Sequence, residues 1–217
     1  MTMLMEKRWL PGQSLVEMLI VLFVISVGLF TAVSLIISNL NLQQLDADQT
    51  MAMNVAREAL ELVQNKRDSN WLGGAAAFDE GILVDGAVPK ADNTAVPAWD
   101  GDSVPDPFFI FAGKDTVAQA RLYRSANPKA PGVFTNASVG NTATDFYRLL
   151  TFYAVCQDPD DPNKKSVSDS AACPPTTPPS ATGYDRKIGL RAKADVQWNR
   201  NGRQKNLTIY GDFYDWR

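Results

Sequence analysis

The fold of this chain is decided by residues 12 to 37, which read GQSLVEMLIVLFVISVGLFTAVSLII. No charged side chain occurs between Met18 and Ile37. An α-helix rises about 1.5 Å per residue, so this run would span roughly 30 Å, which matches the hydrocarbon core of a bilayer. The stretch therefore predicts a helix that crosses a membrane.

The residues on either side predict that the apolar run is retained and how it is oriented. A secretory signal has an apolar core of about 7–15 residues followed by a small-residue cleavage site. Here the run is longer, and Ser38-Asn39-Leu40 after it is not such a site. Lys7 and Arg8 precede the run, whereas the first basic residue after it is Arg57. Because basic residues stay on the cytoplasmic side, we expect a single-pass protein with a cytoplasmic N-terminus and an extracytoplasmic remainder.

One carboxylate, Glu17, lies at the N-terminal end of the apolar run. A charged group in a membrane is costly unless it is paired. Two interpretations follow from the spacing alone. Glu17 lies among the lipid headgroups, where its charge costs little, or it is paired with a cation in an assembly.

The segment Gly12-Gln13-Ser14-Leu15-Val16-Glu17, followed by the apolar run, resembles the N-terminal signature of type IV prepilins and pseudopilins. The resemblance implies that residues 1–12 are a leader, which a prepilin peptidase removes by cutting between Gly12 and Gln13. It also implies N-methylation of Gln13 and a role for Glu17 in subunit packing. After such a cut, the spacing places the new Gln13 amine close enough to neutralise Glu17 of its own chain or of a neighbouring subunit. Most members have phenylalanine or methionine where this chain has Gln13, so methylation here would modify a glutamine in place of the usual residue.

The same resemblance implies a function and a set of partners. The chain would be a structural subunit of a type IV pilus or related fibre, with residues 13–37 as its transmembrane and assembly helix. We favour a minor pilin, because the C-terminal part shows no repeat and no strongly self-complementary apolar edge. The partners would be a prepilin peptidase, other pilin subunits of the same fibre, an inner-membrane assembly platform, and the lipid bilayer before assembly. The subunit would end in a cell-surface pilus, or fimbrium.

Two alternatives share this N-terminus. A type II secretion pseudopilin would serve protein secretion with the same helix. A signal-anchored extracytoplasmic domain for cell adhesion or binding would keep the anchor and never polymerise.

Helical patterning continues beyond the apolar run, over residues 38–72. Neither proline nor glycine occurs between Leu40 and Lys66, and Gly73-Gly74 supplies a stop. The apolar residues recur at the spacing of one helical face, namely Leu45, Ala52, Val55, Ala59 and Leu62. This half of the helix is therefore expected to be amphipathic and to lie on the remaining part of the chain.

Residues 73–217 are expected to form an antiparallel β-sheet of four or so strands after a long loop over 75–107, which leaves room for one short strand. Candidate strands are 108–111, 120–124, 133–135 and 146–156, and residues 188–198 alternate between apolar and polar. Asn201-Gly202 is the strongest short hairpin signal. Folding back around it sets Val196 opposite Leu207, Ala194 opposite Ile209 and Leu190 opposite Phe213. The expected fold class is therefore α+β and pilin-like, with a long N-terminal helix packed on an antiparallel sheet.

The segment 157–184 interrupts this sheet and is expected to be a variable, solvated loop. Cys156 and Cys173 flank much of it, and in an exported domain two such cysteines are expected to form a disulfide. A metal site would need more soft ligands. Clustered aspartates over 157–169 suggest calcium as an alternative. The spacing lacks the glycine and glutamate of an EF-hand, so we favour a plain acidic loop and expect no cofactor.

The composition disfavours enzymes and nucleic-acid-binding proteins. The chain has no histidine, which removes the commonest general base, and no nucleotide-binding or nucleophile motif is present. Asp100, Asp102 and Asp106 lie in a Pro/Gly-rich stretch, where solvated turns are favoured over a hydrolase pair. The formal net charge is -3, and no basic block favours nucleic acid. A membrane-tethered enzyme is accordingly the least favoured class.

Overall fold

The computed structural model describes residues 11–82, 93–100, 108–113, 116–126, 132–173, 184 and 186–215. The leader residues before Pro11, with Lys7 and Arg8, lie outside these ranges. The chain divides into two units, Met1–Asp48 and Gln49–Arg217, which are described separately below.

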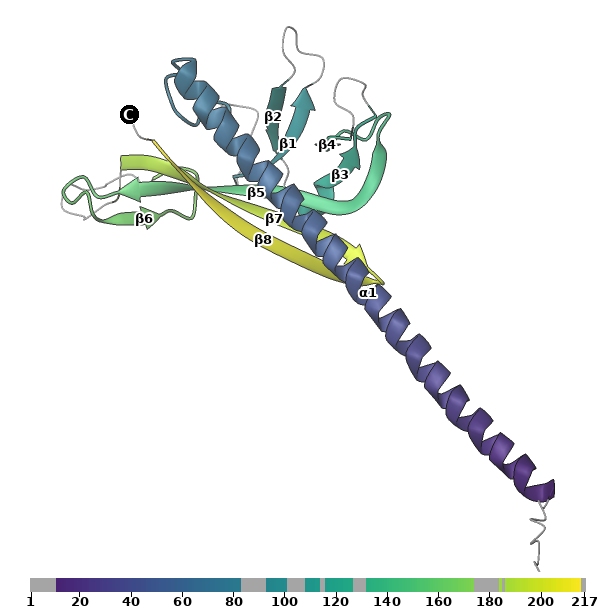
Figure 1. Cartoon of the computed structure of the whole chain (residues 1–217). Helices are drawn as coiled ribbons and strands as arrows, with labels where there is room; N and C mark the ends of the chain where they lie inside the picture. Colours follow the sequence, from purple (N-terminus) through teal and green to yellow (C-terminus); the bar gives the residue numbers. More distant parts are fainter. Residues whose placement is uncertain are drawn as a thin grey trace, which may run out of the picture. The chain divides into compact units, whose positions relative to one another are not determined.

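One helix, α1, runs from Pro11 to Leu72 and contributes to both units (Figure 1). Its end matches the sequence expectation. Gly74 has a φ of 70°, its N–H donates to the Trp71 carbonyl at 3.2 Å, and the Ala75 N–H donates to the Asn70 carbonyl at 2.9 Å. This is a Schellman ending, in which a glycine adopts the left-handed conformation that other residues avoid.

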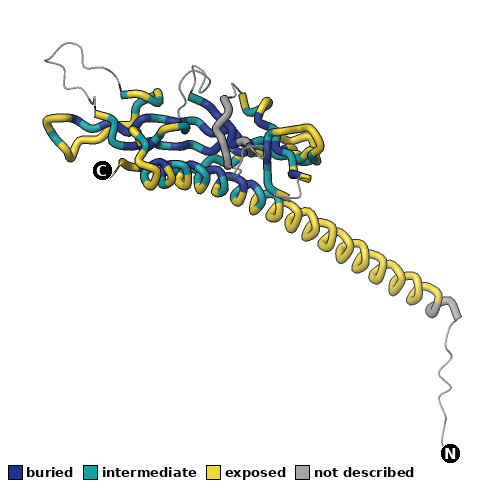
Figure 2. Tube along the Cα trace, turned by 90° about the horizontal axis from the view of Figure 1, so that it is seen from above, coloured by how far each residue is buried: buried dark blue, intermediate teal, exposed yellow. Residues whose placement is uncertain are grey.

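In the first unit, α1 is long and apolar enough to cross a membrane, as the sequence predicts. Every side chain from Leu15 to Ala47 is exposed, and the most apolar window of the helix has no buried residue (Figure 2). The apolar surface of this unit is therefore not covered by the described part of its own chain.

The second unit contains an eight-stranded sheet in which all pairings are antiparallel. The strands are β1 (Thr94–Asp100), β2 (Phe108–Gly113), β3 (Arg121–Arg124), β4 (Phe134–Thr135), β5 (Thr142–Gln157), β6 (Lys165–Val167), β7 (Arg186–Arg200) and β8 (Arg203–Tyr214), with a 3-10 turn η1 (Val117–Gln119) before β3. Strand β5 is central: β7 pairs along one edge, and β3, β1 and β6 pair in succession along the other.

The predicted hairpin register is confirmed at each position. Val196 lies opposite Leu207, Ala194 opposite Ile209 and Leu190 opposite Phe213. Asn201 and Gly202 have φ angles of 51° and 73°, as the two central residues of a type I′ turn require.

The sheet has eight strands where four or so were expected, and two of the eight lie in segments that were expected to be loops. Strand β1 lies within the expected 75–107 loop, where room was left for one short strand, and contains Pro97, which argues against a central strand. It pairs with β5 only through Thr94 and Ala95, so Pro97 lies beyond that ladder and needs no N–H there. Strand β6 lies within the expected 157–184 loop and pairs with residues 155–157 of β5.

The core of the second unit lies between its part of α1 and one face of the sheet (Figure 1). The fully buried helix residues are Ala52, Val55, Ala56, Ala59 and Val63. Of the predicted helical face, Ala52, Val55 and Ala59 are confirmed, Leu62 is half-buried, and Leu45 belongs to the other unit and is 36% exposed. These helix residues form one buried cluster with residues of β5, β7 and β8.

Candidate functional site

The predicted processing and assembly residues all lie at the start of α1. Pro11 is its first residue, a position where the fixed φ of proline suits a helix, and Gly12 and Gln13 follow in the first turn. Of these residues only the backbone is described. Glu17 lies one turn further on, and its side chain is exposed.

Hydroxyl groups within the apolar run are satisfied by the helix itself. Ser26 Oγ donates to the Leu22 carbonyl at 2.7 Å, Thr31 Oγ1 to the Gly28 carbonyl at 2.8 Å and Ser34 Oγ to the Phe30 carbonyl at 2.9 Å. In lipid no water is present to satisfy such groups. The run is thus suited to an apolar environment along its length, and the charged Glu17 lies at its N-terminal end.

Gly28 has no packing role against the described part of its own chain. A Cβ built at this position meets nothing within 4 Å, and its φ is not in the left-handed region. Gly28 follows Glu17 by 11 residues, which places the two within about 20° of each other around a helix that turns 100° per residue. The glycine and the carboxylate therefore share one face of the apolar run.

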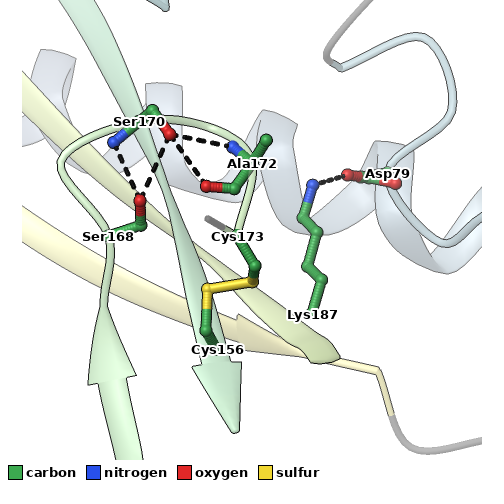
Figure 3. The surroundings of a disulfide bond; sticks show 7 residues. All are labelled: Asp79, Cys156, Ser168, Ser170, Ala172, Cys173 and Lys187. Carbon is green, nitrogen blue, oxygen red and sulfur yellow. Dashed lines mark hydrogen bonds and ion pairs between the residues drawn. A yellow bond between two sulfur atoms is a disulfide. The ribbon is translucent and has the colours of Figure 1, made fainter. Parts of the chain in front are cut away.

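The disulfide between Cys156 and Cys173 is present, with a Cα–Cα distance of 5.8 Å (Figure 3). The segment between β6 and Cys173 lies beside β5, because the Ser168 N–H donates to the Ala154 carbonyl at 2.8 Å and the Ala154 N–H donates to the Ser170 carbonyl at 2.7 Å. Nearby, Lys187 of β7 forms an ion pair with Asp79 (Figure 3). Much of the predicted variable loop is thus tied to the sheet; residues 174–183 lie outside the described ranges.

The aspartates after β5 are engaged in the turns of their own segment. Asp158 Oδ1 accepts from the Asp160 N–H at 2.9 Å, and Asp161 Oδ1 accepts from the Asn163 N–H at 3.1 Å. Among the described residues no group of three His, Cys, Asp or Glu is placed to hold a metal ion. Asp100 lies at the end of β1, whereas Asp102 and Asp106 lie outside the described ranges.

The sequence analysis missed the most deeply buried charged side chain of the described residues, Arg148 of β5. Its side chain is fully buried, Nη1 donates to the Val55 carbonyl at 3.0 Å, and Nη1 lies 3.4 Å from Glu58 Oε2 on α1. Nε and Nη2 have no partner among the described residues. Burial lowers the pKa of the guanidinium, and the nearby Glu58 carboxylate raises it in part. The sequence did contain one signal for this burial. Phe146 and Leu150 face the core, and Arg148 lies between them on the same face of the strand.

No family model matches this chain, and neither a curated protein nor a solved structure matches it. On the structure alone, an apolar N-terminal helix whose later part packs on an antiparallel sheet is consistent with a pilin-like fold.

Proposed function

We propose that this chain is a structural subunit of a type IV pilus or related fibre, and specifically a minor pilin. In this proposal it is inserted as a prepilin with a cytoplasmic N-terminus and cleaved between Gly12 and Gln13. Gln13 is methylated, and the subunit is assembled through α1 into a cell-surface fibre. The observation that carries the proposal is the exposure of every side chain from Leu15 to Ala47 on a helix apolar enough to cross a membrane.

In this proposal the exposed apolar surface is covered in two successive environments. Lipid covers the apolar surface first, and neighbouring subunits replace the lipid when an inner-membrane assembly platform extracts the chain. Little hydrophobic free energy changes in this exchange, because lipid tails and apolar side chains are similar solvents, so close packing and polar contacts must drive association. Gly28 is suited to close packing, since none of the described groups of its own chain lies in the space beside it.

Glu17 provides the polar contact. Its side chain is exposed at the N-terminal end of the apolar run. Once the leader is removed, the amine of Gln13 is a cation within reach of a carboxylate on an adjacent subunit. Such a pair lets the charge enter an apolar fibre interior, where an unpaired carboxylate is costly.

Glu17→Ala is expected to leave membrane insertion and leader removal intact and to reduce incorporation into sheared surface fibres. A loss of about 1.4 kcal/mol per subunit contact corresponds to a tenfold reduction of the equilibrium constant for incorporation. Quantitative immunoblotting measures the processed chain in the membrane fraction and the incorporated chain in the sheared fibre fraction. Asp46→Ala, which removes an exposed carboxylate outside the apolar run of the same helix, is the matched control.

Normal incorporation of the Glu17→Ala chain would contradict the pairing role. Recovery of the wild-type chain only from the membrane fraction, in cells that make fibres, would instead favour the signal-anchored domain that does not polymerise. A type II secretion pseudopilin would be recognised by loss of secretion on deletion of the gene, with surface pili unchanged.

A further inference from the structure

A cavity of about 340 Å³ lies beside the β7–β8 turn, far along the chain from the apolar run. Its lining residues come from β5, β7, the turn and β8: Tyr147, Gln197, Trp198, Asn199, Gly202 and Gln204. The volume is at the lower end of the range for small-ligand sites, about 300–1,000 Å³.

The sheet register brings the lining side chains together. Tyr147 lies opposite Gln197, and Asn199 lies opposite Gln204. Side chains alternate along a strand, and Phe146 and Trp198 contribute to the core beneath α1. Tyr147, Gln197 and Asn199 therefore lie on the opposite face of the sheet, which α1 does not cover.

Two contacts hold this lining in place. The Arg121 guanidinium carbon lies 5.9 Å from the centre of the Tyr147 ring. Gln204 Nε2 donates to Gln197 Oε1, which fixes both amides. The Gln197 NH₂ group, the Gln204 carbonyl oxygen and the Asn199 amide then have no partner among the described residues and are available to a ligand.

The chemistry of the lining selects a class of ligand. It has two aromatic residues, Tyr147 and the core residue Trp198, beside three amides, and no Lys, Arg, Asp or Glu. An amide offers both a donor and an acceptor, which matches a hydroxyl, and the face of an aromatic ring offers an apolar surface. From this set we propose that the cavity binds a neutral saccharide, with its hydroxyls on the amides and its ring beside Tyr147.

An anionic ligand fits less well. Arg121 lies beside the Tyr147 ring, but its Nε already donates to the Thr144 carbonyl at 2.8 Å and its Nη2 lies 3.9 Å from Asp145 Oδ1. The proposal is independent of fibre assembly, because the site lies wholly within the second unit and needs no second subunit.

Saturation-transfer-difference NMR on the full chain in phospholipid nanodiscs tests the proposal. Sugar-based detergents are avoided, since they would compete. The probes are the methyl glycosides of glucose, galactose, mannose and N-acetylglucosamine, each alone, with glucuronic acid as the anionic comparison. Saturation transfer to the ring protons of at least one neutral glycoside is expected. Gln204→Ala and Tyr147→Ala are each expected to weaken binding at least about fivefold, equivalent to 1 kcal/mol.

The controls lie on the same face of the sheet. Asn206→Ala removes an exposed amide two residues from Gln204, and Tyr210→Ala removes a tyrosine that is 59% exposed and does not line the cavity. Gln204 is exposed, so its variant keeps the test valid even if Tyr147→Ala fails to fold. Absence of transfer to every neutral glycoside would overturn the proposal, as would stronger transfer to glucuronic acid or equal loss in the controls.

Discussion

Replacing both Cys156 and Cys173 by alanine is expected to lower the free energy of unfolding of the second unit by about 3 kcal/mol. The disulfide closes a segment with a sequence separation of 17. Cross-linking a loop of this length removes conformational entropy from the unfolded chain worth about 3 kcal/mol in the chain-entropy treatment. Urea unfolding of the full chain in nanodiscs, followed by tryptophan fluorescence, measures the change.

Reduction of the wild-type chain should reproduce this loss without any change of side chain. Reductant added to the double alanine variant provides the control and should have no effect. A midpoint that does not move on reduction would show that the segment beside β5 is held by its backbone hydrogen bonds alone.

Glu58→Gln is expected to destabilise the second unit by about 2 kcal/mol, and Arg148→Met to leave it equally stable or more stable by about 1 kcal/mol. Arg148 is fully buried, so losing the Glu58 charge leaves an uncompensated guanidinium in the core. Removing one partner of a buried pair costs about 3–5 kcal/mol, and the figure is reduced here because the Glu58 side chain is 32% exposed. Replacing a buried ion by an apolar residue of similar length is often neutral or stabilising.

The double variant separates this pair from other effects. With Met at position 148, the Glu58→Gln change should cost close to nothing, since no buried cation remains. Glu61→Gln, at an exposed position of the same helix, is the matched control. An equal cost of Glu58→Gln with and without Arg148 would contradict the role of the pair.

The parts of the fold that the sequence predicted are those where two local signals agree. Around Asn201-Gly202, the turn chemistry and the alternation of Val196 and Ala194 require the same register, and that register is observed. Similarly, Gly74 ends α1 where the helical pattern stops.

Tertiary context decided the parts that were missed. Pro97 argues against a strand unless it lies beyond the ladder to β5, and only the assembled sheet places it there. Arg148 was not singled out because a strand arginine is expected to face solvent, whereas its Glu58 partner comes from α1, far away in the sequence.

The candidate functional residues likewise fall into those that the sequence identified and those that only the assembled sheet brings together. Gly12, Gln13 and Glu17 were identified through their order before an apolar run, and their proposed roles need a peptidase and a second subunit that a single chain does not include. The cavity beside the β7–β8 turn had no sequence signal, because its lining residues are brought together only by the pairing of Asn199 with Gln204 and of Tyr147 with Gln197.

The most direct measurement for the proposed function is the intact mass of the chain recovered from cells with and without a prepilin peptidase. With the peptidase, the mature chain should begin at Gln13 and carry one additional methyl group, and the same species should be found in sheared surface fibres. Without the peptidase, the full 217-residue chain should remain in the membrane. A chain that retains residues 1–12 in the presence of an active peptidase would contradict the account.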